Sequence, residues 1–102
     1  MDLKKLQKQV YNHKAKRGFN VKDVSMEFCL LSEELSEAYR AYYQKEDNLG
    51  EELADVFIYL LGLAEILKVD LEKEFVKKME KNKNRVYKKN KKGVLVKQNL
   101  KS

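Results

Sequence analysis

The amino-acid sequence predicts an all-α fold, a four-helix bundle-like arrangement with a short basic C-terminal tail. Charged residues make up 37% of the 102-residue chain and proline is absent, a composition typical of long amphipathic helices. Apolar residues recur at spacings of three and four along most of the chain, which is the period of an α-helix. Polar, turn-forming segments interrupt this pattern at three places, so four helices are expected.

The first two helices lie on either side of a glycine-containing turn. Residues 2–16 form a short amphipathic helix, because apolar residues recur on one face from Leu3 to Val10. The second helix is expected to begin with Asn20 as its N-cap and to run to about Tyr43. Its core stripe is expected to comprise Val24, Phe28, Leu31, Leu35, Ala38 and Tyr42.

The third and fourth helices differ in their apolar content. After a polar connection over residues 44–50, the third helix covers roughly residues 49–68 and is nearly apolar all round from residue 56 to 67. This predicts that it is the most buried helix of the bundle. The fourth helix is expected from Leu71 to about Tyr87, with a thin apolar stripe among polar and basic residues.

Charge divides the chain into two parts. Residues 71–102 carry twelve Lys/Arg and three Glu, whereas residues 1–70 carry ten basic and thirteen acidic residues. The basic part could attract phosphates or nucleic acid. We therefore predict a helical domain over residues 1–87 and a basic tail over residues 88–102. Within the tail, residues 94–96 are either a short strand or a strap across the bundle.

The sequence shows no sign of export or membrane insertion. No apolar run approaches the roughly 20 residues that cross a bilayer, and the N-terminus lacks the apolar region of a signal peptide. The single cysteine, Cys29, rules out an internal disulfide. A cytoplasmic protein without membrane contact is the expectation.

Two acidic clusters flank the connection between the second and third helices. Glu34 and Glu37 are three residues apart, and so are Glu52 and Asp55, so each pair shares one helical face. Tyr59 lies one turn further along the second of these faces. Two antiparallel helices joined by a short connection can set the two pairs opposite each other. The sequence therefore predicts four carboxylates in one cleft.

Such a group of acids favours a metal ion. Two like charges 4 Å apart repel by about 4 kcal/mol at an effective dielectric constant near 20, and a cation would relieve this repulsion. Oxygen ligands alone favour Mg²⁺, with Mn²⁺ as a substitute. A solvated acidic helix face is the other interpretation. A di-iron site is excluded because it needs Glu-x-x-His motifs, and the only histidine, His13, is remote from both clusters in the sequence.

A second set of polar residues lies on the fourth helix. Lys78, Asn82 and Arg85 stand at positions i, i+4 and i+7, so they are expected to share a helical face. Ammonium, amide and guanidinium groups in such a row could hold phosphate oxygens. The other interpretation is a solvated basic helix end.

The segments EELSE at 33–37 and ELAD at 52–55 resemble the EExxE…ExxD signature of the MazG-like, all-α nucleoside triphosphate pyrophosphohydrolases. The following segments, DVFIYLLGLAEIL and VDLEKEFVKKMEKNKNR, are also similar, so the resemblance extends over residues 24–87. It implies Mg²⁺-dependent hydrolysis of a (d)NTP to the monophosphate and pyrophosphate. It further implies a homodimer or homotetramer.

The resemblance also implies roles for individual residues. The metal ligands would be Glu34, Glu37, Glu52 and Asp55. The catalytic residues would be Glu33 and Glu34, with Glu33 orienting or deprotonating the attacking water. The substrate-binding residues would be Lys78, Asn82, Arg85, Tyr59, Phe19 and Asn20, of which Phe19 and Asn20 are candidates for base recognition. Some members use a tryptophan near the base, and this chain has none, so the resemblance does not fix the base.

Two other functions are consistent with parts of the sequence. A small basic helical protein could bind nucleic acid through its tail with a strong salt dependence. However, no helix-turn-helix spacing, zinc ligand set or aromatic RNA-binding motif specifies such a site. A catalytically idle or regulatory relative of the pyrophosphohydrolases is the third interpretation.

Overall fold

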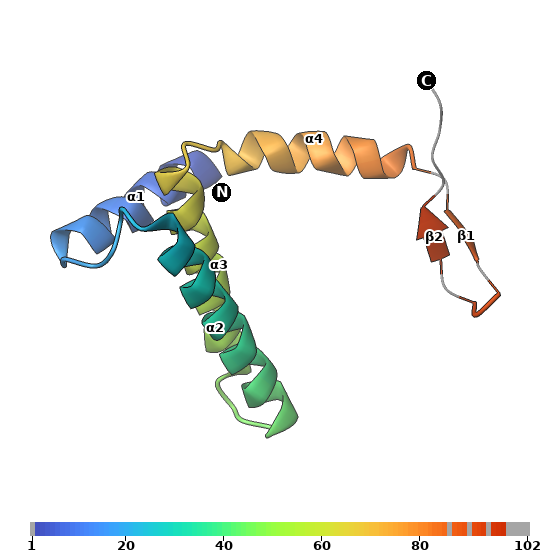
Figure 1. The fold of residues 1–102 in the computed structure, drawn as a ribbon, viewed down its shortest axis with the longest axis horizontal. Helices are drawn as coiled ribbons and strands as arrows, with labels where there is room; N and C mark the ends of the chain where they lie inside the picture. The colour runs from blue at the N-terminus through green and yellow to red at the C-terminus, as the bar shows by residue number, and fades with distance from the viewer. Residues whose placement is uncertain (1, 86, 90, 94, 98–102) are drawn as a thin grey trace. The chain divides into compact units, whose positions relative to one another are not determined.

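The computed structural model describes residues 2–85, 87–89, 91–93 and 95–97, and it confirms the all-α fold class. Within the described residues, four helices are followed by one short β-hairpin (Figure 1). The chain divides into two compact units after Glu72, and each unit is described by itself. The elements are α1 (Leu3–Lys16), α2 (Val24–Tyr43), α3 (Leu49–Ile66), α4 (Leu71–Lys83), β1 (Tyr87–Lys89) and β2 (Leu95–Lys97).

Aspartates cap the first two helices. The side chain of Asp2 accepts a hydrogen bond from the backbone N–H of Lys5 at 3.1 Å and so begins α1. Asp23, not Asn20, is the N-cap of α2, and it accepts from the backbone N–H of Met26 at 3.0 Å. The predicted start at Asn20 was wrong because the Asn20 side chain accepts from the backbone N–H of Asp23 and forms a turn before the helix.

The first unit is built around α3. Helices α2 and α3 run side by side after a tight turn, and α1 also packs against α3 (Figure 1). Gly62, in the buried part of α3, permits the close approach of α1. A Cβ atom at this position would lie 3.3 Å from Val10 Cγ1 and 3.4 Å from Lys14 Cδ.

The hydrophobic core is smaller than the sequence predicts. Four consecutive residues of α3, from Leu61 to Ala64, are buried, as expected for this helix. On α2, however, the predicted core stripe is wrong at several positions, although Ala38 is buried. Phe28, Leu35 and Tyr42 are 52%, 58% and 66% exposed. The apolar face of α2 is wider than the strip that α3 covers, so these side chains remain on the surface of the single chain.

A buried glutamine joins the end of α3 to the start of α4. The Gln7 side chain donates from Nε2 to the carbonyl of Val69 at 2.8 Å and accepts from the backbone N–H of Leu71 at 2.9 Å. Both backbone groups are thereby satisfied at the point where one helix ends and the next begins.

The second unit holds most of α4 and the hairpin. Helix α4 ends at Lys83, earlier than predicted, and Tyr87 opens β1 instead of closing the helix. Strands β1 and β2 are antiparallel, with Lys88 opposite Val96. Residues 94–96 were predicted as either a short strand or a strap. Residues 95 and 96 lie in strand β2, and Val94 lies outside the described residues. Along the chain, the first unit ends at Glu72 and the second begins at Lys73. The predicted domain boundary at residue 87 stays a prediction.

None of the helices in the described ranges is both long enough and apolar enough to cross a membrane.

Candidate functional site

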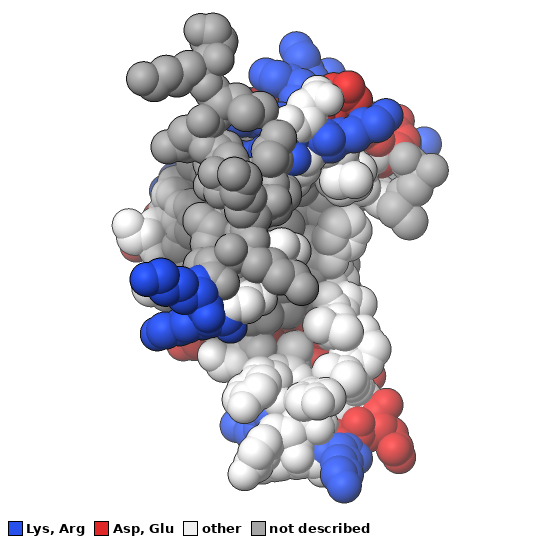
Figure 2. Space-filling view, turned by 90° about the vertical axis from the view of Figure 1, so that its right-hand side faces the viewer, with Lys and Arg blue, Asp and Glu red and all other residues white. Residues whose placement is uncertain are grey.

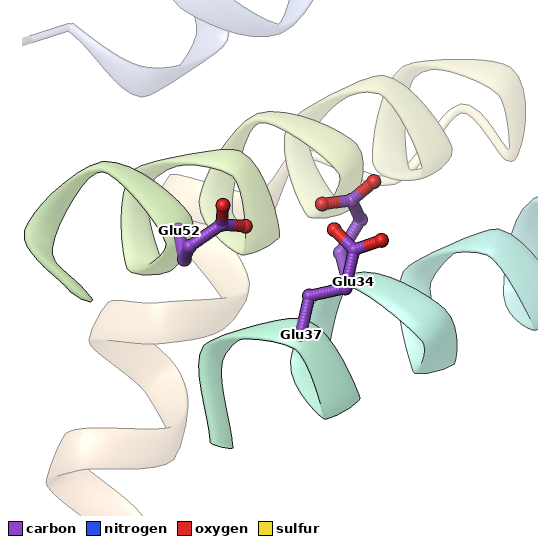
Figure 3. A group of neighbouring side chains, drawn as sticks. All are labelled: Glu34, Glu37 and Glu52. Carbon is purple, nitrogen blue, oxygen red and sulfur yellow. The ribbon is translucent and has the colours of Figure 1, made fainter. Parts of the chain in front are cut away.

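Three carboxylates gather where α2 faces α3 (Figure 3). Glu34 and Glu37 project from α2, and Glu52 projects from the first turn of α3. One oxygen of each side chain lies within 4.8 Å of an oxygen of the other two. The helical spacing and the short connection thus place three of the four predicted acids in one group.

The acids of this group raise one another's proton affinity. Burial raises the pKa of Glu34, and so do the charges of Glu37 and Asp55. Burial and the charges of the same two neighbours also raise the pKa of Glu52. The ionised forms are therefore disfavoured in the folded chain, and a cation between them would relieve the repulsion.

The donor set fits a hard divalent cation. Glu52 Oε1 accepts a hydrogen bond from Asn48 Nδ2 at 3.2 Å, whereas the buried Glu52 Oε2 has no hydrogen-bond partner among the described residues. A buried carboxylate oxygen without a donor is suited to a metal ion, and Mg²⁺ and Mn²⁺ prefer oxygen ligands. Asn48 occupies the N-cap position of α3. Its side chain makes no capping hydrogen bond and instead orients Glu52.

The two remaining acids lie near this group. Asp55 is half-buried, one turn beyond Glu52 on α3, and its charge acts on the acids of the group although it is not a member. Glu33 is exposed and lines an open hollow of about 320 Å³ together with Glu37 and Arg40. The roles of Asp55 as a ligand and of Glu33 as a catalytic residue stay predictions.

Glu52→Gln is expected to raise the melting temperature of the metal-free protein by a few degrees in EDTA at pH 7.5. The raised pKa means that ionised Glu52 destabilises the folded state above that pKa, and an amide of the same shape removes the charge. The gain should shrink as pH falls and the wild-type carboxylate becomes protonated. Differential scanning calorimetry measures both effects.

Glu80→Gln is the control, because it removes an equal charge from an exposed position on α4. A melting temperature lowered by Glu52→Gln would contradict the repulsion argument.

A cavity of about 180 Å³ lies in the same unit and unites residues from three helices and a loop. Phe19, Asn20 and Tyr59, all predicted to contact substrate, come together in its wall. Burial raises the pKa of Tyr59, as do the charges of Glu34 and Asp55, so its phenol keeps its proton at neutral pH and can donate a hydrogen bond. The wall comprises His13, Lys14, Phe19, Asn20, Glu27, Leu30, Ile58 and Tyr59.

Sequence reasoning missed two charged residues in this wall. Glu27 forms an ion pair with Lys14, and the Lys14 ammonium also lies 5.2 Å from the centre of the Tyr59 ring. The signal was present in the sequence. Glu27 is three residues after Val24 and four before Leu31, so it is an acid on the inner face of α2.

The predicted phosphate-binding residues belong to the second unit. Lys78 and Asn82 lie on α4, but Arg85 follows the end of that helix, so the expected face shared by all three was wrong. The buried Asn82 Oδ1 has no hydrogen-bond partner in the part of the chain that the structure describes. The role of these three residues in binding substrate stays a prediction.

Comparison with known proteins identifies a family and a similar solved structure. The sequence profile of the MazG nucleotide pyrophosphohydrolase domain matches residues 23–88. The fold is similar to that of the cyanophage S-2L MazG-like pyrophosphohydrolase bound to dGDP and three catalytic Mn²⁺ ions per active site. That alignment has a TM-score of 0.73 and 22% sequence identity, and it covers 97% of this chain and 99% of the other. No curated protein matches the sequence significantly.

Proposed function

Since the chain belongs to the MazG family of nucleotide pyrophosphohydrolases, which hydrolyse phosphoanhydride bonds of nucleotides, we propose that it uses Mg²⁺ to convert a (d)NTP to the (d)NMP and pyrophosphate. The observation that carries the proposal is the group of three carboxylates whose oxygens lie within 4.8 Å of one another. The unpartnered oxygen of Glu52 gives this group a reason to bind a cation. A cytoplasmic location is part of the same proposal.

The three acids of the group and the two acids near it have different proposed roles in the reaction. Glu34, Glu37, Glu52 and Asp55 would hold Mg²⁺, or Mn²⁺ in its place. When bound, the ion would neutralise phosphate charge and lower the pKa of the attacking water. Glu33 and Glu34 would be the catalytic residues, with Glu33 orienting the attacking water or accepting its proton. In-line attack then breaks the bond between the α- and β-phosphates.

The cavity supplies the proposed binding site for the base. Phe19 and Tyr59 offer aromatic surface, and Asn20 offers an amide. The dGDP and Mn²⁺ bound to the S-2L enzyme support a nucleotide substrate and the use of Mn²⁺. Lys78, Asn82 and Arg85 are proposed as ligands of the phosphates.

A turnover assay tests this function. The full chain is incubated with each common NTP and dNTP plus Mg²⁺, and the release of pyrophosphate and of monophosphate is measured. We expect pyrophosphate and monophosphate to be released in equal amounts. EDTA should abolish this release, and added Mg²⁺ or Mn²⁺ should restore it. If folded protein with metal turns over none of these nucleotides, the catalytic proposal fails and a regulatory relative becomes the better interpretation.

We also propose that the chain forms a homodimer or homotetramer through the exposed apolar surface of α2 and α3. Leu35, Tyr39, Tyr42 and Leu53 are all more than half exposed, and they line one open hollow with Ala38 and Leu49. Figure 2 shows that the end of the α2–α3 pair, at the bottom of the view, presents mostly uncharged side chains. A monomer rarely exposes so continuous an apolar surface, and a symmetric copy would bury it.

Tyr42→Lys is expected to shift the protein from the oligomer to the monomer, because the charge would be buried in the proposed interface. Size-exclusion chromatography with light scattering measures the mass. Gln44→Lys adds a charge to a neighbouring exposed position at the end of α2 and should leave the mass unchanged. A wild-type protein that is monomeric at micromolar concentration would contradict the proposal.

A further inference from the structure

The cavity wall contains a buried ion pair that helix packing does not explain. Glu27 on α2 is only 1% exposed, and its Oε1 atom pairs with the ammonium of Lys14 on α1. The same cavity wall contains the apolar residues Leu30 and Ile58. Two apolar residues would join these helices without the desolvation penalty of two charges. The presence of this ion pair therefore requires an explanation other than its contribution to the stability of the fold.

The second oxygen of this carboxylate supplies that reason. Glu27 Oε2 is buried and has no hydrogen-bond partner among the residues that the structure describes. A buried acceptor left without a donor is strongly disfavoured unless a ligand or a water molecule supplies one. Glu27 forms part of the cavity wall, so a ligand in the cavity would lie next to this carboxylate.

The neighbouring groups define what such a ligand must present. Lys14 has ammonium protons beyond the one directed at Glu27, and it lies over the face of the Tyr59 ring. The wall thus offers one anionic acceptor, one cationic donor and flat apolar surface from Tyr59 and Phe19. A planar ring that carries N–H donors beside an acceptor matches all three.

We propose that Glu27 and Lys14 select nucleobases that carry an exocyclic amino group, namely cytosine, adenine and guanine, over uracil and thymine. Glu27 Oε2 accepts from the N–H groups of such a base, and the Lys14 ammonium donates to its ring nitrogen or carbonyl oxygen. Uracil and thymine can also donate their single N–H to Glu27 Oε2, but this N–H is flanked by two carbonyl oxygens. When one carbonyl accepts from Lys14, the other lies next to the carboxylate and is repelled by it. This inference rests on the proposed function, because it assigns the substrate class of the same site.

Binding of the four deoxynucleoside monophosphates dAMP, dGMP, dCMP and dTMP to the full chain, measured by calorimetry, tests the inference without requiring hydrolysis. At least one of the amino-bearing nucleotides is expected to bind about tenfold more tightly than dTMP, the effect of one hydrogen bond to a charged group. Glu27→Gln should lose or reverse this preference, since an amide can donate to a thymine carbonyl. Glu65→Gln, at a half-buried acid outside the cavity wall, should keep it.

The double variant Lys14→Met/Glu27→Met removes both charges together and covers the case in which Glu27→Gln fails to fold. It is expected to bind the four nucleotides with similar affinity. The inference is overturned if wild type binds dTMP as tightly as the others, if it binds none of the four, or if the folded variants keep the wild-type preference. A base preference without turnover of any triphosphate would overturn the proposed function alone, and turnover without a base preference would overturn this inference alone.

Discussion

Glu37→Ala is expected to reduce the rate of pyrophosphate release by about 100-fold or more at saturating Mg²⁺. Loss of a group that only orients a metal ligand commonly costs 10–100-fold in metal affinity or activity, so loss of a ligand should cost at least as much. Glu37 contributes an oxygen to the three-acid group, and alanine contributes none. Initial rates with the preferred nucleotide, measured over a range of Mg²⁺ concentrations, give the size of the effect.

Glu51→Ala is the matched control. Glu51 lies in the first turn of α3 next to Glu52, is exposed and does not belong to the three-acid group. Its removal should leave the rate within a few-fold of wild type. Circular dichroism confirms that both variants are folded. If folded Glu37→Ala keeps near wild-type turnover, the assignment of the metal site to this group is wrong.

Mg²⁺ is expected to raise the melting temperature of the wild-type protein by on the order of 10 °C relative to EDTA. A ligand at about 100 times its Kd stabilises the folded state by about 2.7 kcal/mol, and about 1 kcal/mol shifts the melting temperature of a domain this small by several degrees. At the proposed site the ion would bind the assembled acids, which are apart in the unfolded chain. A thermal melt at several Mg²⁺ concentrations measures the shift.

The shift should be small in Glu37→Ala, which lacks one of the three acids, and unchanged in Glu51→Ala. Mn²⁺ should act in the same direction as Mg²⁺. An equal shift in wild type and Glu37→Ala would mean that the ion stabilises the chain elsewhere, for example by screening surface charge.

The local elements and the acid group could be predicted because both follow from spacing along one chain. Apolar residues at intervals of three and four identify α1, α2 and α3, and the predicted start of α3 agrees with its first residue, Leu49. The same helical period places Glu34 and Glu37 on one face of α2. The short connection then brings Glu52 opposite them, so three of the four predicted ligands lie together.

The start of α2 and the end of α4 were predicted wrongly, and both errors have local causes. Asn20 and Asp23 are both good capping residues, and the choice between them depended on which backbone N–H each side chain reaches. Helix α4 was predicted to reach Tyr87, but it ends at Lys83, and Tyr87 pairs across a hairpin. The residues that pair in this hairpin show no clear apolar pattern. The sequence therefore left residues 94–96 undecided between a strand and a strap.

The amino-acid sequence by itself determined the fold class, the order of the helices and the acids that meet between α2 and α3, because a helical period fixes which residues share a face. The tertiary structure decided which faces are covered and which distant residues meet. It paired Lys14 with Glu27 inside a cavity and left Leu35 and Tyr42 on the surface. Periodicity marks a residue as facing inward, but burial depends on the area that neighbouring helices cover, and in a single chain of this size that area is limited.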